Sequence, residues 1–173
     1  EYIKAEIEYW NATKLSKTVE PKLFARLATI YYEQGRLIES FSLLTNAVAL
    51  NPEDVELRTK LATIWVTFRQ FSQARSEAPF VLGKQPDHKE AMLLFADAAP
   101  RPEDILAARR QIAEIQRTSG ETWATHAALA ALALRDKQTN AAEQELQLAA
   151  KLDAKAPHVN VALAQLASFR GQP

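Results

Sequence analysis

The chain has 173 residues, and its 21 Lys and Arg residues balance 21 Asp and Glu residues to a formal net charge of zero. This balance supplies no basic surplus for nucleic acid or for an anionic membrane, so we expect neither as a partner. The chain contains no cysteine, which excludes disulfides, thiolate metal sites and cysteine nucleophiles. No apolar run approaches the roughly 18 residues that span a bilayer, so we expect no direct membrane insertion.

Apolar residues recur every three or four positions along most of the chain, which is the period of a helix with one buried face. Glycine is scarce and runs of β-branched residues are short, so few segments favour strands. The pattern predicts an all-α protein of ten helices, at residues 3–16, 22–34, 37–50, 55–68, 71–84, 89–98, 103–118, 122–135, 139–152 and 157–169.

The sequence repeats itself at intervals of 34 residues. The strings RLATIYYEQG and KLATIWVTFR begin at Arg26 and Lys60. The same spacing places a large apolar residue and an alanine in one register five times: Leu27-Ala28, Leu61-Ala62, Phe95-Ala96, Leu129-Ala130 and Leu163-Ala164. Helices whose axes cross about 8–10 Å apart need a small residue at the crossing, so we expect these alanines to lie where helices pack.

Residues 21–54, PKLFARLATIYYEQGRLIESFSLLTNAVALNPED, resemble a unit of the tetratricopeptide repeat family, which has 34 residues in two antiparallel helices. The matching positions are Leu27, Ala28, Tyr31, Gly35, Leu44, Ala47 and Pro52. The segment departs from the family at Ser40, where alanine is usual. The resemblance covers nearly the whole chain and implies a right-handed α-solenoid of antiparallel helix pairs.

The register divides the chain into a single domain with incomplete units at both ends. We expect a half repeat at 1–20, repeats at 21–54, 55–88, 89–122 and 123–156, and a half repeat at 157–173. Because both ends fall inside repeats and the first residue is Glu, we expect a piece excised from a longer chain.

Prolines interrupt the pattern in two places. Pro79 lies inside the second helix of the second repeat, where it removes a hydrogen bond and is expected to kink the helix. This kink either changes the curvature of the solenoid or widens a groove for a ligand. In the third repeat, Pro100 and Pro102 flank Arg101, so the first helix must end early and the next one begins early. That break is either a longer loop or a rigid contact for a partner.

The resemblance implies that a peptide binds along a concave groove lined by the first helix of each repeat. Carried over column by column, the groove residues are Lys22, Arg26, Thr29, Lys60, Thr63, Glu90, Leu93, Leu94, Asp97, Ala128, Ala131, Arg135, Val161, Ala162 and Gln165. This groove is polar at its N-terminal end and apolar from Leu93 onward, so we expect Leu93 and Leu94 to anchor the partner.

The residues that would carry an enzymatic site are missing from the pattern. The three histidines, His88, His126 and His158, have no metal-ligand spacing, and no glycine-rich phosphate loop or nucleophile elbow occurs. We therefore expect no enzyme activity, metal or cofactor. Co-chaperone members of the family hold a terminal carboxylate with Lys, Asn and Arg side chains. The matching positions here are Ala25, Thr29, Lys60, Glu90 and Leu94, so we expect no such carboxylate clamp.

The resemblance thus implies a non-enzymatic scaffold that binds a protein or peptide. Two alternatives stay open. The first is a structural spacer or self-association segment of a larger protein, for example one of a bacterial envelope or secretion system. The second is the regulatory repeat region of an enzyme whose catalytic domain is absent. The sequence is compatible with the cytoplasm and with a bacterial periplasm or envelope.

Overall fold

The computed structural model describes residues 21–169, so the helix predicted at 3–16 lies outside the described residues. All regular elements within that range are α-helices. Their bounds are α2 (Pro21–Glu33), α3 (Leu37–Leu50), α4 (Val55–Thr67), α5 (Phe71–Lys84), α6 (Lys89–Asp97), α7 (Pro102–Ser119), α8 (Trp123–Arg135), α9 (Thr139–Leu152) and α10 (Pro157–Phe169). Each bound lies within one residue of the sequence prediction, which confirms the helical period and the 34-residue register.

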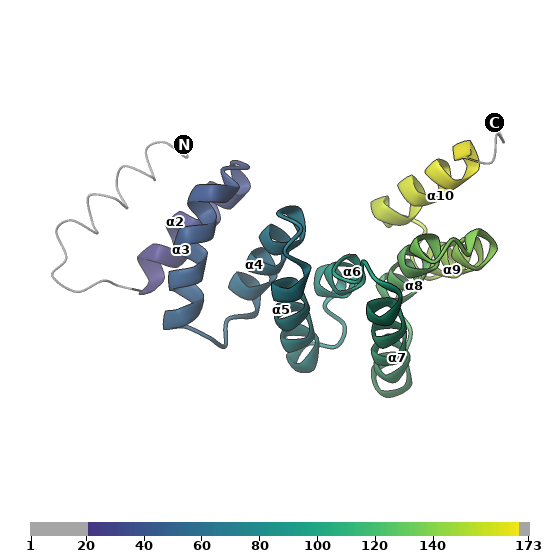
Figure 1. Ribbon diagram of the computed structural model, residues 1–173, viewed down its shortest axis with the longest axis horizontal. Helices are drawn as coiled ribbons and strands as arrows, with labels where there is room; N and C mark the ends of the chain where they lie inside the picture. Colours follow the sequence, from purple (N-terminus) through teal and green to yellow (C-terminus); the bar gives the residue numbers. More distant parts are fainter. Residues whose placement is uncertain (1–20, 170–173) are drawn as a thin grey trace, which may run out of the picture.

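The helices follow one another along the long axis of the molecule, from α2 at one end of the described chain to α10 at the other (Figure 1). Within repeats, α2 packs closely on α3, α4 on α5 and α8 on α9. The third repeat differs, because α6 packs closely on α8 of the next repeat and only loosely on α7. The described chain is therefore an α-solenoid with one irregular unit near its middle.

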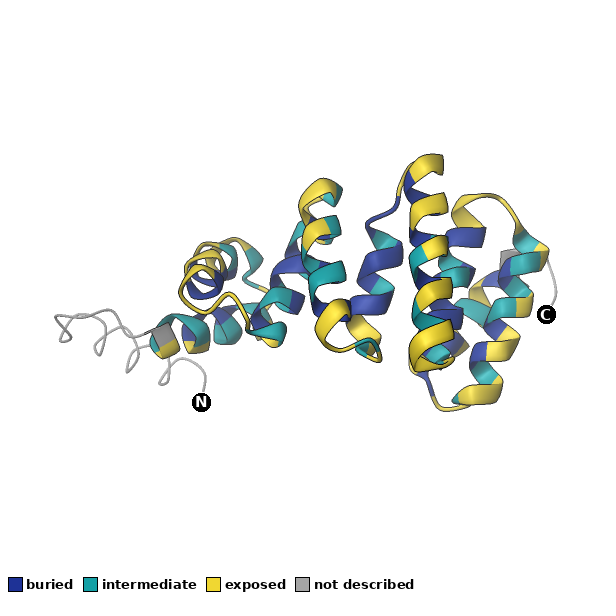
Figure 2. Cartoon of the chain, turned by 90° about the horizontal axis from the view of Figure 1, so that it is seen from below, coloured by how far each residue is buried: buried dark blue, intermediate teal, exposed yellow. Residues whose placement is uncertain are grey.

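Three apolar clusters form the core of the described chain. The helices α4 and α8 each contribute residues to two of these clusters. The first cluster joins α2, α3 and α4, the second joins α4 through α8, and the third joins α8, α9 and α10. Buried residues lie on the helix sides that face neighbouring helices, and exposed residues lie on the outer sides (Figure 2). No described repeat buries its apolar face alone, as in other solenoids.

The alanines of the repeat lie where the sequence places them, with one exception. Ala28, Ala62, Ala96 and Ala130 are fully buried. The hydroxyl of Ser40 donates a hydrogen bond of 2.8 Å to the carbonyl of Ala28, and Ser40 is itself buried. Ser40 can therefore replace the alanine that is usual at this buried position, because its hydroxyl has a hydrogen-bond partner. Ala164 is exposed, because no described helix packs against that side of α10.

A left-handed residue makes the turn between the two helices of three repeats. Gly35, Arg69 and Lys137 have φ of 73°, 58° and 60°, and they are spaced by whole multiples of 34 residues. After each of them, the next backbone N–H bonds to a carbonyl five residues earlier, as from Gln138 to Ala133 at 2.8 Å. These bonds satisfy the last carbonyls of the first helix. The third repeat uses a different turn.

Prolines act differently in the two interrupted repeats. α5 continues as a helix through Pro79, and Ala78 beside it is fully buried. α6 ends at Asp97 and α7 begins with Pro102 in its first turn, followed by Glu103. Proline is favourable there because the first N–H groups of a helix have no partner within it. The early start predicted for α7 is therefore confirmed.

We expect Ala62→Leu to lower the free energy of unfolding by about 1–3 kcal/mol, because the added atoms overpack a closed helix crossing. Ala164→Leu is the matched control from the same column. Its side chain is exposed, so we expect a change of less than about 0.5 kcal/mol. Urea unfolding followed by circular dichroism measures both. Equal losses at the two positions would contradict the assigned packing.

Gly35→Ala and Gly83→Ala should change stability in opposite directions. A Cβ meets nothing within 4 Å at either site. At Gly35 the left-handed backbone strains alanine, so we expect a loss of about 1 kcal/mol. At Gly83, within α5, alanine favours the helix and should add about 0.5 kcal/mol. Thermal melts of both variants test this, and a gain for Gly35→Ala would rule out the left-handed turn.

Candidate functional site

The structure places most of the predicted groove residues on an accessible surface. The exposed members are Lys22, Arg26, Glu90, Arg135, Val161 and Gln165. The half-buried members are Thr29, Lys60, Thr63, Leu93, Asp97, Ala131 and Ala162. Leu94 and Ala128 are buried, with exposed fractions of 7% and 0%.

The burial of Leu94 corrects the prediction that its side chain anchors a partner. Successive helical residues point about 100° apart, and at this position the two leucines take different environments. Leu94 belongs to the core cluster that joins α4 through α8, whereas Leu93 lines a pocket. Ala128 is in the same core cluster as Leu94. The apolar positions on α6 and α8 were therefore assigned too broadly, because core and groove residues alternate along these helices.

The N-terminal end of the predicted groove contains both charged and apolar side chains. A pocket of about 370 Å³ between α2 and α4 is lined by Ala25, Arg26, Thr29, Ile30, Asp54, Glu56 and Leu57. Its carboxylates already have partners in the described chain. Asp54 accepts a hydrogen bond from the backbone N–H of Leu57 at 3.0 Å and caps α4, and Lys60 pairs with Glu56 at 2.6 Å. The carboxylates of this pocket therefore already have hydrogen-bond or ion-pair partners within the chain.

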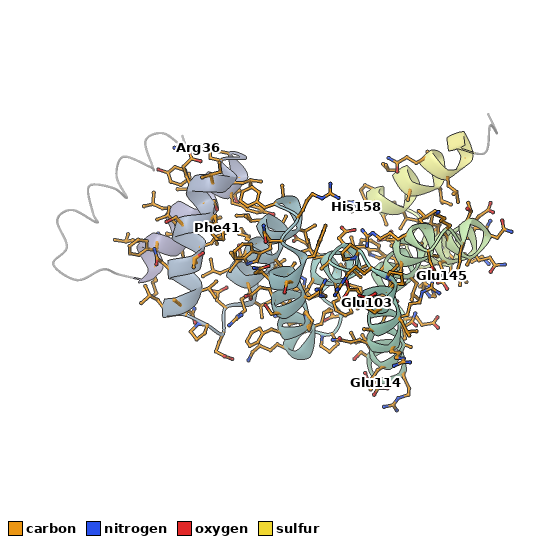
Figure 3. All side chains as sticks on the ribbon, in the orientation of Figure 1. Arg36, Phe41, Glu103, Glu114, Glu145 and His158 are labelled. Atoms are coloured by element: carbon orange, nitrogen blue, oxygen red, sulfur yellow. The ribbon has the colours of Figure 1, made fainter. Side chains whose placement is uncertain are left out.

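The C-terminal end contains two pockets that share Leu134 and Ala162. We call them the large pocket and the small pocket, and together the apolar groove. The large pocket measures about 530 Å³ and is lined by Leu134, Lys137, Thr139, Ala162, Gln165 and Leu166. The small pocket measures about 190 Å³ and lies between α6, α8 and α10, with Leu93 and Ala131 in its wall. His158 lines it from the first turn of α10 (Figure 3).

Four residues of the large pocket were missed by the sequence analysis: Leu134, Lys137, Thr139 and Leu166. Leu134 is 41% exposed, although α8 is otherwise largely buried. Helical spacing could have found it, because it lies three residues after Ala131 on the same side of the helix. Lys137 could not be found this way, because it belongs to the turn between α8 and α9.

A third pocket, the rim pocket, adjoins the small pocket at Asp97 and measures about 400 Å³. It also contains Arg69 and Arg135. Arg135 donates one hydrogen bond to the carbonyl of Ala96 and another, of 2.7 Å, to the carboxylate of Asp97. Because these acceptors lie in the last turn of α6, the guanidinium caps that helix and joins it to α8. Arg135, predicted as a groove residue, also holds the groove together.

An ionic cluster holds the loop between α6 and α7, which carries the rim-pocket residue Pro100. Arg75 on α5 donates to the carbonyl of Ala98 at 2.9 Å and lies 3.3 Å from the buried carboxylate of Asp104. Arg101 donates to the same carboxylate at 2.9 Å and 3.1 Å. These hydrogen bonds from Arg101, assisted by the charge of Arg75, hold the pKa of Asp104 below its usual value, and burial opposes them.

His126 is buried between two carboxylates. Its Nδ1 lies 2.7 Å from Glu145, on α9, and its Nε2 lies 3.4 Å from Glu121. Both ring nitrogens therefore have partners, as a structural histidine requires. Within residues 21–169, no group of three or more His, Cys, Asp or Glu side chains could hold a metal ion. In the same range, no helix combines the length and the apolar character needed to cross a membrane.

Comparisons with known proteins identify the fold. No family model and no curated protein matches the chain. A tetratricopeptide repeat protein from Parabacteroides merdae ATCC 43184 is similar in structure, with a TM-score of 0.76 and 16% identity over 99% of this chain and 68% of that chain. TTC0263, a thermophilic TPR protein of Thermus thermophilus, has a TM-score of 0.71 and 19% identity over 88% and 84% of the two chains.

A third similar structure is MamA, from residue 41 to its end, from Desulfovibrio magneticus RS-1. Its TM-score is 0.61, with 14% identity over 90% of this chain and 88% of that chain. These identities are low, so the likeness concerns the fold. The described chain has the tetratricopeptide repeat fold, which confirms the resemblance found in the sequence.

We expect Asp104→Asn to lower stability at pH 7 by about 1–2 kcal/mol, because charge-assisted hydrogen bonds are lost. Because the pKa of Asp104 is lower in the folded state, its ionised carboxylate stabilises the fold at any pH above its pKa in the unfolded state, which is about 3.9. This stabilisation is lost as the pH falls through the pKa of Asp104 in the folded state. Urea unfolding at pH 7 and pH 2.5 should therefore show a difference between variant and parent that shrinks in acid. Glu103→Gln, in the same turn but exposed, is the control, and an equal pH effect there would contradict the assignment.

Proposed function

We propose that this tetratricopeptide repeat chain is a non-enzymatic scaffold that binds a segment of another protein in the apolar groove between α6, α8 and α10. The observation that supports this proposal is the joined pair of pockets on the first-helix side of the solenoid. A volume of about 530 Å³ falls within the range of protein ligand sites, roughly 300–1,000 Å³.

The lining of this groove fits a protein segment. Leu134 and Leu166 supply apolar surface, and Ala131 and Ala162 supply small side chains that allow close approach of another backbone. Burying such surface is favourable by about 25 cal/mol for each Å² of apolar area. The polar groups at the edge, which include Gln165, can bond to a bound main chain.

The remaining faces favour this location. The N-terminal pocket contains carboxylates that already have partners. On the second helices the large exposed apolar side chains include Ile38 on α3 and Leu106 on α7, which lie far apart in the sequence and line no described pocket. Self-association through such residues remains the alternative function, and the experiment below separates the two.

We expect Leu134→Arg to abolish partner binding, because a charge and a long side chain would fill the junction of the large and small pockets. The measurement is affinity capture from the source cell's lysate with quantitative mass spectrometry, using the 173-residue chain. Leu106→Arg is the matched control, because Leu106 is also an exposed leucine, on α7. Circular dichroism must show that both variants remain folded.

Partners lost with Leu134→Arg and retained with Leu106→Arg would support the groove. Partners that bind both variants equally would contradict it. Light scattering on the same samples measures the molar mass. A dimer that dissociates with Leu106→Arg, together with no captured partner, would instead support self-association.

A further inference from the structure

The charges around the groove are unevenly distributed. The large, small and rim pockets are lined by the cations Arg69, Arg135 and Lys137, and by one carboxylate, that of Asp97. Asp97 is neutralised by Arg135 at 2.7 Å. Two cationic side chains therefore remain on the rim of a groove whose lining is otherwise apolar or uncharged.

These two cations have no acidic partner in the described part of the chain. Neither Arg69 nor Lys137 makes a salt bridge with a residue of 21–169. Asp136, which is next to Lys137 in the sequence, instead lies 3.6 Å from Arg109 on α7. Arg101, in the neighbouring loop, already bonds to Asp104. The charges of Arg69 and Lys137 are thus available to a ligand.

The backbone fixes where both side chains begin. Arg69 and Lys137 occupy the left-handed position of their turns, with φ of 58° and 60°. The N–H of Arg69 bonds to the carbonyl of Val66 at 2.9 Å, and the N–H of Lys137 bonds to that of Leu134 at 3.0 Å. Each turn therefore holds its cation at the edge of a pocket, while the flexible stem can adapt to a bound group.

We propose that the groove binds an acidic-apolar segment of a partner protein. A large apolar side chain of that segment enters the large pocket between Leu134 and Leu166, and Asp or Glu side chains beside it pair with Lys137 and Arg69. This inference rests on the proposed function and adds the chemistry of the partner. Charge complementarity supports an acidic segment. A basic segment would be repelled by the two cations, and an uncharged segment would form no ion pair with either of them.

Selection from a random peptide library tests this chemistry directly, because the library presents acidic, basic and neutral segments together. Phage-displayed random twelve-residue peptides are selected on the 173-residue chain, and the sequences that bind are compared with the unselected library. We expect enrichment of Asp and Glu within about four residues of Leu, Ile, Phe or Trp. Selected peptides that lack this enrichment, or that are enriched in Lys and Arg, overturn the inference.

The most enriched peptide then serves as the probe in fluorescence anisotropy with charge-reversed variants. We expect Lys137→Glu to weaken binding about tenfold or more and Arg69→Glu about threefold or more, because each reversal replaces attraction by repulsion. Lys155→Glu is the matched control. Its side chain is exposed in the turn between α9 and α10, outside all three pockets, and we expect a change below about twofold.

Equal effects of Lys137→Glu and Lys155→Glu would overturn the inference, because a general change in net charge would then explain them. The proposed function would still stand if Leu134→Arg abolished binding of the same peptide. Peptides that bind the Leu134→Arg variant as well as the parent, or a library that yields no binding peptide, would overturn both. Circular dichroism of every variant confirms that a loss of binding is not a loss of folding.

Discussion

The first helices α2, α4, α6 and α8 each carry a buried alanine whose position leaves no room for a larger side chain. A small residue lets crossing backbones come close together, and the large apolar residue before each alanine can then fill the adjacent space. Ser40 is accepted at a second such position because its hydroxyl bonds to the carbonyl of Ala28. The rest of the solenoid depends on this spacing. It sets where successive first helices lie, and therefore how far apart the walls of the groove stand.

The fold could be predicted from the sequence because its determinants are local and repeated. The alanine column and the helical period lie in one register, so each unit supported the next. The break at Pro100 and Pro102 was also predictable, because a fixed φ and a missing N–H act at the residue itself. The helix bounds followed from these constraints, even for the short α6.

The site could be predicted only in outline. Column matching gave residues that are mostly accessible, but it could not separate Leu93, which lines a pocket, from Leu94, which is in the core. That distinction depends on the close packing of α6 against α8 in the irregular third repeat. Lys137 was missed for another reason, because turn residues have no helical period. Its place in the wall of the large pocket arises from the tertiary placement of α10, which no local pattern encodes.

The shared helices have a consequence for how the molecule unfolds. α4 contributes one side to the first apolar cluster and another to the second, and α8 likewise belongs to the second and third. Loosening either helix must therefore open two clusters together, whereas loss of α10 opens only one. The cooperative units of the solenoid are thus blocks centred on α4 and α8, and their boundaries do not coincide with the repeats of the sequence. Amide hydrogen exchange would accordingly be slowest in these two helices and would quicken toward α10.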